Sequence, residues 1–173
     1  SLTFFLAAIF TNNIIIGTLA LALAGSTLAF LKFNFPPAKI YMGNSGSIFL
    51  GFTLAAIAIT ISYAPLKREI ALLTTILILG LPIYDIFFVT LMRLKNGRAI
   101  FKKSKDHFAL CLISIGYSKR KVLLFMYGFS LLFSVSALII SRATNQMGIL
   151  ILAVVAIICL SLGKKISKVT VDG

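Results

Sequence analysis

Long runs of apolar residues constrain this chain more than any other feature of its sequence. Hydrophobic residues make up 60% of the chain and charged residues only 12%, whereas a soluble domain carries about 25% charged residues. The apolar residues gather into runs of about 20, the length that crosses the hydrocarbon core of a bilayer. Because lipid offers the backbone no hydrogen-bond partner, such runs must be helices. The sequence therefore predicts an all-α, polytopic integral membrane helix bundle.

Five full transmembrane helices and one partial N-terminal helix are predicted. Residues 2–10 are too few to cross a bilayer, and the polar triplet Thr11-Asn12-Asn13 follows them as a tight turn. The five full spans are expected at residues 14–31, 47–63, 70–93, 122–141 and 147–163. We expect residues 1–173 to form a single transmembrane domain. Because the chain starts inside an apolar run without an initiator Met, we expect it to be the C-terminal part of a longer protein.

The basic residues predict the orientation of the helices. All but three of the 17 Lys and Arg residues fall on one set of alternate connections, and the exceptions are Lys67, Arg68 and Arg142. Lys and Arg concentrate on the cytoplasmic side of a membrane. The loops at residues 32–46 and 94–121 are therefore expected in the cytoplasm. The charges flank the spans without an aromatic platform or a recognition motif, so they do not indicate nucleic acid. They indicate membrane topology and anionic lipids, a basic surface for a phosphate-rich substrate, or both.

A Pro- and Gly-rich segment from Asn34 to Gly51 separates the first two full spans. Its two prolines, Pro36 and Pro37, prevent a helix from continuing through them. The run Gly43-Asn44-Ser45-Gly46-Ser47 can form a turn, and Ser45 or Ser47 can cap a helix that begins near Ile48. The free N–H groups of such a helix end can hold phosphate oxygens. The alternative is a re-entrant turn whose polar residues serve only as caps.

Two further polar features are Asp85, inside the span at residues 70–93, and a short helix expected in the loop at residues 94–121. Pro82 is expected to kink its span shortly before Asp85, a carboxylate that is costly inside a membrane unless it is paired or near water. Asp85 has either a functional role or an interfacial one, paired with a basic neighbour. Ser104 is expected to cap a short helix of residues 105–115 that Gly116 ends, and Ser118 is expected to cap the next span.

Two segments carry a resemblance to a known family. The segment NFPPAKIYMGNSGSIFLG resembles the pattern NFPPA-K/R-I-F-x-G-D-S-G-S-x-F-L-G of the polyprenyl-phosphate N-acetylhexosamine-1-phosphate transferases, with Asn44 in place of the aspartate. The segment KNGRAIF, with Asp106-His107, Leu112, Gly116 and Ser118 after it, resembles the same family's histidine-bearing loop. The resemblance implies the C-terminal half of an enzyme that transfers a sugar 1-phosphate from a UDP-sugar to polyprenyl (undecaprenyl) phosphate. Such enzymes start the glycans of peptidoglycan, teichoic acid and lipopolysaccharide O-antigen in the bacterial inner (plasma) membrane.

The resemblance also implies site residues and ligands. His107 is expected to be catalytic, and Asn44 is expected to lie at a Mg²⁺ site, because Mg²⁺ prefers hard oxygen ligands. The expected partners are polyprenyl phosphate, UDP-N-acetylhexosamine and the membrane, and a homodimer is compatible with the family. The residues expected to bind substrate are Asn34, Lys39, Gly43, Ser45, Gly46, Arg98 and Asp106.

The sequence departs from the family pattern at positions that matter for catalysis. Asn44 offers Mg²⁺ only a neutral oxygen, and the family's His-His-Arg falls on Ala109, Leu110 and Cys111. The family's upstream Asp-Asp pair is absent from these residues. We therefore expect weak or no catalytic activity from this chain. The alternative is a non-catalytic membrane scaffold or lipid-phosphate-binding protein derived from the same family.

Overall fold

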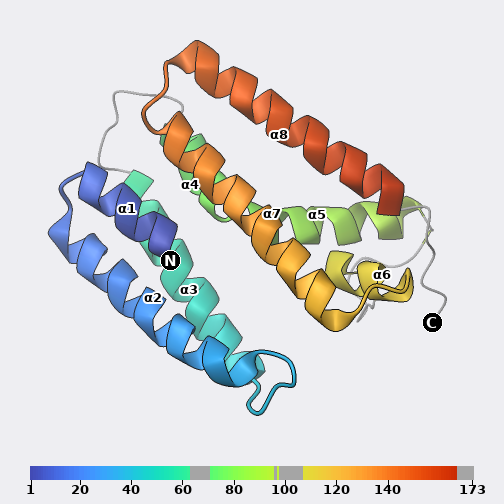
Figure 1. The fold of residues 1–173 in the computed structure, drawn as a ribbon. Helices are drawn as coiled ribbons and strands as arrows, with labels where there is room; N and C mark the ends of the chain where they lie inside the picture. The colour runs from blue at the N-terminus through green and yellow to red at the C-terminus, as the bar shows by residue number, and fades with distance from the viewer. Residues whose placement is uncertain (63–70, 96, 98–106, 167–173) are drawn as a thin grey trace. The chain divides into compact units, whose positions relative to one another are not determined.

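A computed structural model describes residues 1–62, 71–95, 97 and 107–166 of the chain (Figure 1). These residues form α-helices joined by turns and contain no strand, as predicted. The helices are α1 (Leu2–Phe10), α2 (Ile14–Asn34), α3 (Gly43–Ser62), α4 (Ala71–Ile78), α5 (Gly80–Lys95), α6 (Phe108–Ser114), α7 (Lys119–Ile140) and α8 (Asn145–Ile166).

The helices divide into two compact units. The first unit comprises residues 1–78 and 137–142, and therefore contains α1 to α4 with the last turn of α7. The second unit comprises residues 79–136 and 143–173, and contains α5, α6, most of α7 and α8.

In the first unit, α1 packs along α2 through small side chains. Ala8, Ala20 and Ala24 are buried, and a Cβ added at Gly17 would lie 3.7 Å from Cβ of Ala8. The polar turn between the two helices is confirmed. Asn12 has a φ of 52°, a conformation that Asn tolerates, and the side-chain oxygen of Asn13 accepts a hydrogen bond from the N–H of Ile16 at 3.2 Å.

The span predicted at residues 70–93 is two shorter helices in the structure. Helix α4 ends at Ile78 and α5 begins at Gly80, with Leu79 between them. Pro82 explains this break, because a proline lacks the N–H that would bond to the carbonyl four residues earlier, and its ring clashes with that carbonyl. That carbonyl belongs to Ile78. The predicted kink is therefore an interruption of the helix.

The predicted count of five full spans is not confirmed. Among the described residues, four helices are long and apolar enough to cross a membrane: α2, α3 (over Gly43–Ile61), α7 and α8. The predicted loops are also shorter than expected, because α2 continues to Asn34, α3 begins at Gly43 and α7 begins at Lys119.

The core of the second unit is built around Phe108, the first residue of α6. Its side chain has no exposed surface, and the ring centroids of Tyr84 and Phe88 on α5 lie 5.3 and 5.2 Å from its own in edge-to-face geometry. The ring of Phe129 on α7 stacks on it at 6.1 Å. The other buried residues of this core are Met92, Cys111, Leu112, Val122 and Ile166. One short helix thus joins α5, α7 and α8 into a single apolar cluster.

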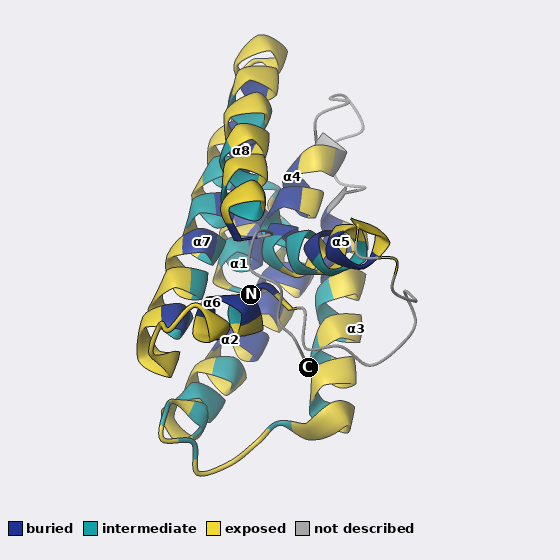
Figure 2. Cartoon of the chain, turned by 90° about the vertical axis from the view of Figure 1, so that its right-hand side faces the viewer, coloured by how far each residue is buried: buried dark blue, intermediate teal, exposed yellow. Residues whose placement is uncertain are grey.

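The outer faces of the helices are strongly apolar. Figure 2 shows exposed residues along most of α8, and among them Leu150 and Ile157 are each 65% exposed. A soluble protein rarely exposes large contiguous apolar patches. These faces suit contact with lipid chains, in agreement with the hydropathy of the sequence.

We expect Gly80→Ala to destabilise the second unit. A Cβ at Gly80 would lie 2.5 Å from Cδ1 of Phe133 on α7, closer than packed carbon atoms approach. Overpacking of this kind costs about 1–3 kcal/mol, and thermal unfolding in detergent would measure it. Gly128→Ala is the matched control, because nothing lies within 4 Å of a Cβ at Gly128 on α7. Equal stability of the Gly80→Ala and unchanged proteins would contradict this close approach of α5 and α7.

Candidate active site

The connection between α2 and α3 folds back onto the C-terminal end of α2. The side-chain amide of Asn34 donates a hydrogen bond to the carbonyl oxygen of Ile40 at 2.9 Å. The backbone N–H of Lys39 donates to the carbonyl oxygen of Phe33 at 2.8 Å. Asn34 therefore holds the loop by its backbone, while the side chain of Lys39 is exposed. The chain leaves α2 in an extended conformation at Phe35, as the two following prolines require.

The start of α3 differs from the sequence prediction. The helix begins at Gly43, so residues 43–47 are its first turns and do not form a loop in front of it. Gly43 has a φ of 67°, which a glycine adopts without strain. The hydroxyl of Ser47 donates to the carbonyl oxygen of Asn44 at 2.9 Å, inside the helix. The prediction that Ser45 or Ser47 caps a helix starting near Ile48 is therefore wrong.

This helix start exposes the polar residues that the sequence singled out. Gly43, Asn44 and Ser45 are exposed, whereas Gly46 is half-buried under the side chain of Met42. The first four N–H groups of any α-helix have no partner within the helix. Together with the helix dipole, they make the start of α3 suitable for binding phosphate oxygens.

Asp85 on α5 makes two polar contacts at the start of α6. Its Oδ2 lies 2.8 Å from Nδ1 of His107, and its Oδ1 accepts a hydrogen bond from the backbone N–H of Phe108 at 2.9 Å. The Asp85 side chain is 24% exposed, and that of His107 is 51% exposed. One carboxylate on α5 thus caps the first amide of α6 and also holds the histidine ring just before that helix.

Helix α6 is fixed at its other end as well. Gly116 has a φ of 104°, and its N–H donates to the carbonyl oxygen of Ile113 at 2.9 Å. The N–H of Tyr117 donates to the carbonyl oxygen of Leu112 at 3.3 Å, which completes a Schellman motif. The prediction that Gly116 ends this helix is confirmed. The predicted N-cap, Ser104, lies outside the described residues, and the structure gives the capping role to Asp85.

The described residues offer little to a divalent metal. Within the described part of the chain, no three His, Cys, Asp or Glu residues come together. Mg²⁺ is usually held by one or two carboxylates, whereas Asn44 supplies a neutral oxygen. Both oxygens of Asp85 already take part in the contacts with His107 and Phe108. These residues alone do not fit a Mg²⁺ site.

The structure brings only some of the predicted site residues together. Asn34, Lys39 and residues 43–46 share the α2–α3 connection of the first unit, whereas His107 belongs to the second unit. Their convergence on one membrane face stays a prediction. Arg98 and Asp106 lie outside the described residues. The pairing of Asp85 with His107 was not predicted from the sequence, although a basic neighbour was one alternative for Asp85.

Comparison with known proteins shows the family of this chain. Residues 1–62 match the family model described as glycosyl transferase family 4. A probable undecaprenyl-phosphate N-acetylglucosaminyl 1-phosphate transferase of Bacillus subtilis is 34% identical over 146 residues, which is 84% of this chain and 40% of that protein. This chain belongs to glycosyl transferase family 4. No solved structure matches it significantly.

Two further relatives have names that describe phosphotransferases of similar kinds. A phospho-N-acetylmuramoyl-pentapeptide-transferase of Clostridium beijerinckii is 37% identical over 126 residues, covering 70% of this chain and 35% of that protein. A decaprenyl-phosphate N-acetylglucosaminephosphotransferase of Mycobacterium leprae is 37% identical over 120 residues, covering 63% of this chain and 30% of that protein. The family 4 chain thus spans well under half the length of these relatives. With its apolar helices, it is a multi-pass membrane protein.

We expect Asp85→Ala to loosen α6, because the amide of Phe108 and the ring of His107 both lose their partner. Loss of a helix cap costs about 0.5–2 kcal/mol, and faster hydrogen exchange of the α6 amides would report it. Asp85→Asn keeps an oxygen acceptor and should cost less. Ser118→Ala is the matched cap variant on α7. It removes only a long hydrogen bond of 3.4 Å from the N–H of Lys121 to the Ser118 hydroxyl, so it should leave the exchange of the α6 amides unchanged. Unchanged exchange in Asp85→Ala would show that the carboxylate does not hold this helix.

Proposed function

We propose that this chain acts in the transfer of an N-acetylhexosamine 1-phosphate from a UDP-sugar to polyprenyl phosphate during synthesis of bacterial cell-envelope glycans. The names of its relatives support the reaction class. The observation that carries the proposal is the contact of Asp85 with His107, which fixes a half-exposed imidazole beside the start of α6.

The reaction brings two phosphate groups together, so a site for it must bind and orient anions. The exposed N–H groups at the start of α3 are the proposed contact for phosphate oxygens of the substrate. The exposed Lys39 supplies positive charge from the loop before this helix. Asn34 is a positioning residue here, because its amide holds the loop through the carbonyl of Ile40.

The contact with Asp85 decides what His107 can do. A carboxylate accepts hydrogen bonds, so Nδ1 of His107 carries the proton in this contact. The other ring nitrogen, Nε2, is then available to a substrate phosphate, to which it donates when the ring is protonated. Asp85 acts through His107 and through the amide of Phe108, and is therefore a positioning residue.

We propose that the substrate contacts of both units, at the start of α3 and at His107, face the cytoplasm. The distribution of basic residues supports this side, because the connections that carry Lys39 and His107 belong to the same Lys- and Arg-rich set. The UDP-sugar would approach from water, and polyprenyl phosphate from the membrane. Arg98 and Asp106 remain candidates for the same substrate contacts on the resemblance alone.

We expect slow turnover from the chain as it stands, and a gain from Asn44→Asp. A carboxylate at the start of α3 would supply the charge that Mg²⁺ prefers, and one electrostatic group in a site commonly changes turnover by about a hundredfold. Release of UMP from UDP-N-acetylhexosamine and undecaprenyl phosphate, with and without Mg²⁺, is the measurement. Asn145→Asp at the start of α8 adds the same charge elsewhere and serves as the control.

Two outcomes would contradict this expectation. Fast turnover by the unchanged chain would refute the weak activity. No turnover in any variant, with the fold intact, would favour a non-catalytic scaffold or lipid-phosphate-binding protein.

In the Asn44→Asp background, we expect His107→Ala to lower turnover by about 10²–10³-fold, as removal of one donor from a reacting site does. Asp85→Asn should have a smaller effect, because its amide oxygen can still accept from Nδ1. A double-mutant cycle tests the coupling: Asp85→Asn should have almost no further effect once His107 is Ala. Additive effects would mean that Asp85 acts independently of the histidine.

A further inference from the structure

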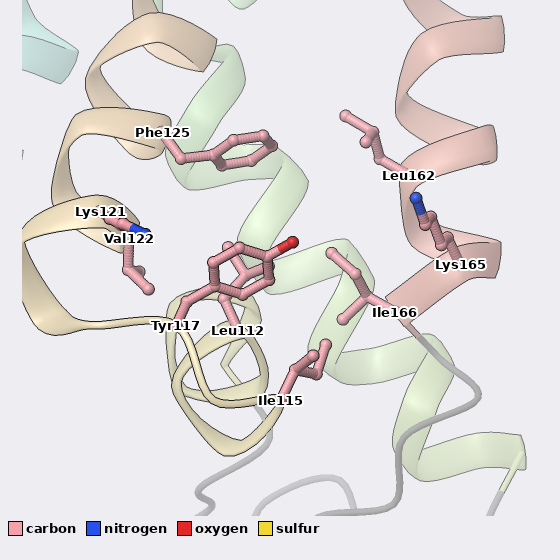
Figure 3. A pocket seen from close by; sticks show the side chains of 9 residues that line it. All are labelled: Leu112, Ile115, Tyr117, Lys121, Val122, Phe125, Leu162, Lys165 and Ile166. Carbon is pink, nitrogen blue, oxygen red and sulfur yellow. The ribbon is translucent and has the colours of Figure 1, made fainter.

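A groove opens beside the core of the second unit, and neither Asp85 nor His107 lines it (Figure 3). It has a volume of about 350 Å³ and lies between the end of α6, the start of α7 and the end of α8. Its apolar lining consists of Leu112, Ile115, Val122, Phe125, Leu162 and Ile166. Tyr117, Lys121 and Lys165 complete it, and we call it the lysine groove.

The floor of the lysine groove is formed by residues of the packed core. Leu112, Val122 and Ile166 are buried and belong to the core of the second unit. The Schellman motif at the end of α6 bonds the N–H of Tyr117 to the carbonyl of Leu112, and so fixes the tyrosine beside the groove. The apolar surface is therefore built in and does not depend on a mobile side chain.

The cations of the groove come from two different helices. Lys121 lies in the first turn of α7, and Lys165 lies in the last turn of α8. Both side chains are exposed, and Figure 3 shows them on opposite sides of the Tyr117 ring. Both helices are long and apolar enough to cross a membrane. A lysine at such a helix end lays its stem on apolar surface and places its ammonium at the depth of lipid headgroups.

The chemistry of the lining selects the ligand. All nine lining residues are apolar, aromatic or cationic. Basic pockets between transmembrane helices are typical sites for anionic lipid headgroups. The volume is at the small end of the roughly 300–1,000 Å³ of ligand sites, which suits part of one lipid chain.

A second groove of about 360 Å³, lined by Tyr84, Phe88, Lys95 and Lys164 among others, lies along α5 and α8. Positive charge thus gathers around the end of α8.

We propose that the lysine groove binds an anionic phospholipid of the phosphatidylglycerol type, with one acyl chain on the apolar floor and the phosphate between Lys121 and Lys165. This site does not depend on the proposed transferase activity. It serves a membrane lipid that is not consumed, and the contacts of Asp85 with His107 play no part in it.

The absence of tryptophan from the chain allows a direct test. Phe125→Trp places the sole tryptophan in the groove, at a side chain that is 39% exposed. The full 173-residue chain is reconstituted in phosphatidylcholine vesicles that contain brominated phosphatidylglycerol or, at equal mole fraction, brominated phosphatidylcholine. Bromine quenches tryptophan on contact. Ile115→Trp is a second groove reporter, and Leu131→Trp, on α7 at a 64% exposed position that does not line the groove, reports bulk lipid.

We expect the groove reporters to prefer brominated phosphatidylglycerol by about fivefold for each lysine, and so by roughly 25-fold for both, from the usual contribution of a lysine at an anionic surface. Leu131→Trp should show almost no preference. Lys121→Gln with Lys165→Gln should bring the groove reporters close to equal quenching. Lys32→Gln with Lys119→Gln removes the same charge outside the groove and should leave the preference in place.

Three results would overturn the proposal. Equal quenching by both brominated lipids at the groove reporters would mean that the groove has no headgroup preference. No quenching by either would mean that protein covers it. Recovery of fluorescence by undecaprenyl phosphate, at amounts at which unlabelled phosphatidylglycerol does not compete, would assign the groove to a polyprenyl phosphate.

Discussion

The fold depends on one constraint: backbone polar groups at a helix end that is buried in an apolar core must find a partner in the protein. Both ends of α6 illustrate it. The first amide of α6 is satisfied by Asp85, and its last carbonyls are satisfied by the N–H groups of Gly116 and Tyr117. In the same unit, the hydroxyl of Tyr84 on α5 donates to the carbonyl of Cys159, inside α8, at 3.0 Å. The same Asp85 also contacts His107, the candidate catalytic histidine. One carboxylate therefore caps α6 and positions a residue of the candidate site.

The sequence predicts the elements whose ends carry a local signal. The turn at residues 11–13 and the end of α6 are confirmed, because Asn12 and Gly116 adopt the positive φ that their residue types favour. The cap of α7 by Ser118 is confirmed as well, since its hydroxyl accepts from the N–H of Lys121. At the start of α3 the local signal is ambiguous. Two glycines could have taken the positive φ, and only the structure shows that Gly43 does so, while Gly46 is helical beneath Met42.

Local sequence signals do not predict contacts between residues that are far apart in the chain or the exact form of a helix break. A kink at Pro82 was predictable from that residue and the carbonyl of Ile78 four positions earlier, but the sequence did not show that the helix is interrupted outright. Asp85 stood out as a carboxylate in an apolar span, yet its partner lies 22 residues away, beyond a segment of irregular composition. No periodic pattern links the two. The lysine groove likewise forms only when α6, α7 and α8 pack together, which residue spacing does not specify.

The break at Leu79 has a consequence for the surrounding membrane. Helix α5 has 16 residues, which at the usual rise makes it about 24 Å long, and α4 has 8 residues, or about 12 Å. The hydrocarbon core is about 30 Å thick, so neither α4 nor α5, over the residues described, crosses it alone. Hydrophobic mismatch of this kind is met by thinning of the bilayer or by polar groups that reach into it. For a helix that does not cross the core by itself, such an adjustment would bring water and headgroups closer to Asp85 and lower the free-energy cost of a carboxylate there.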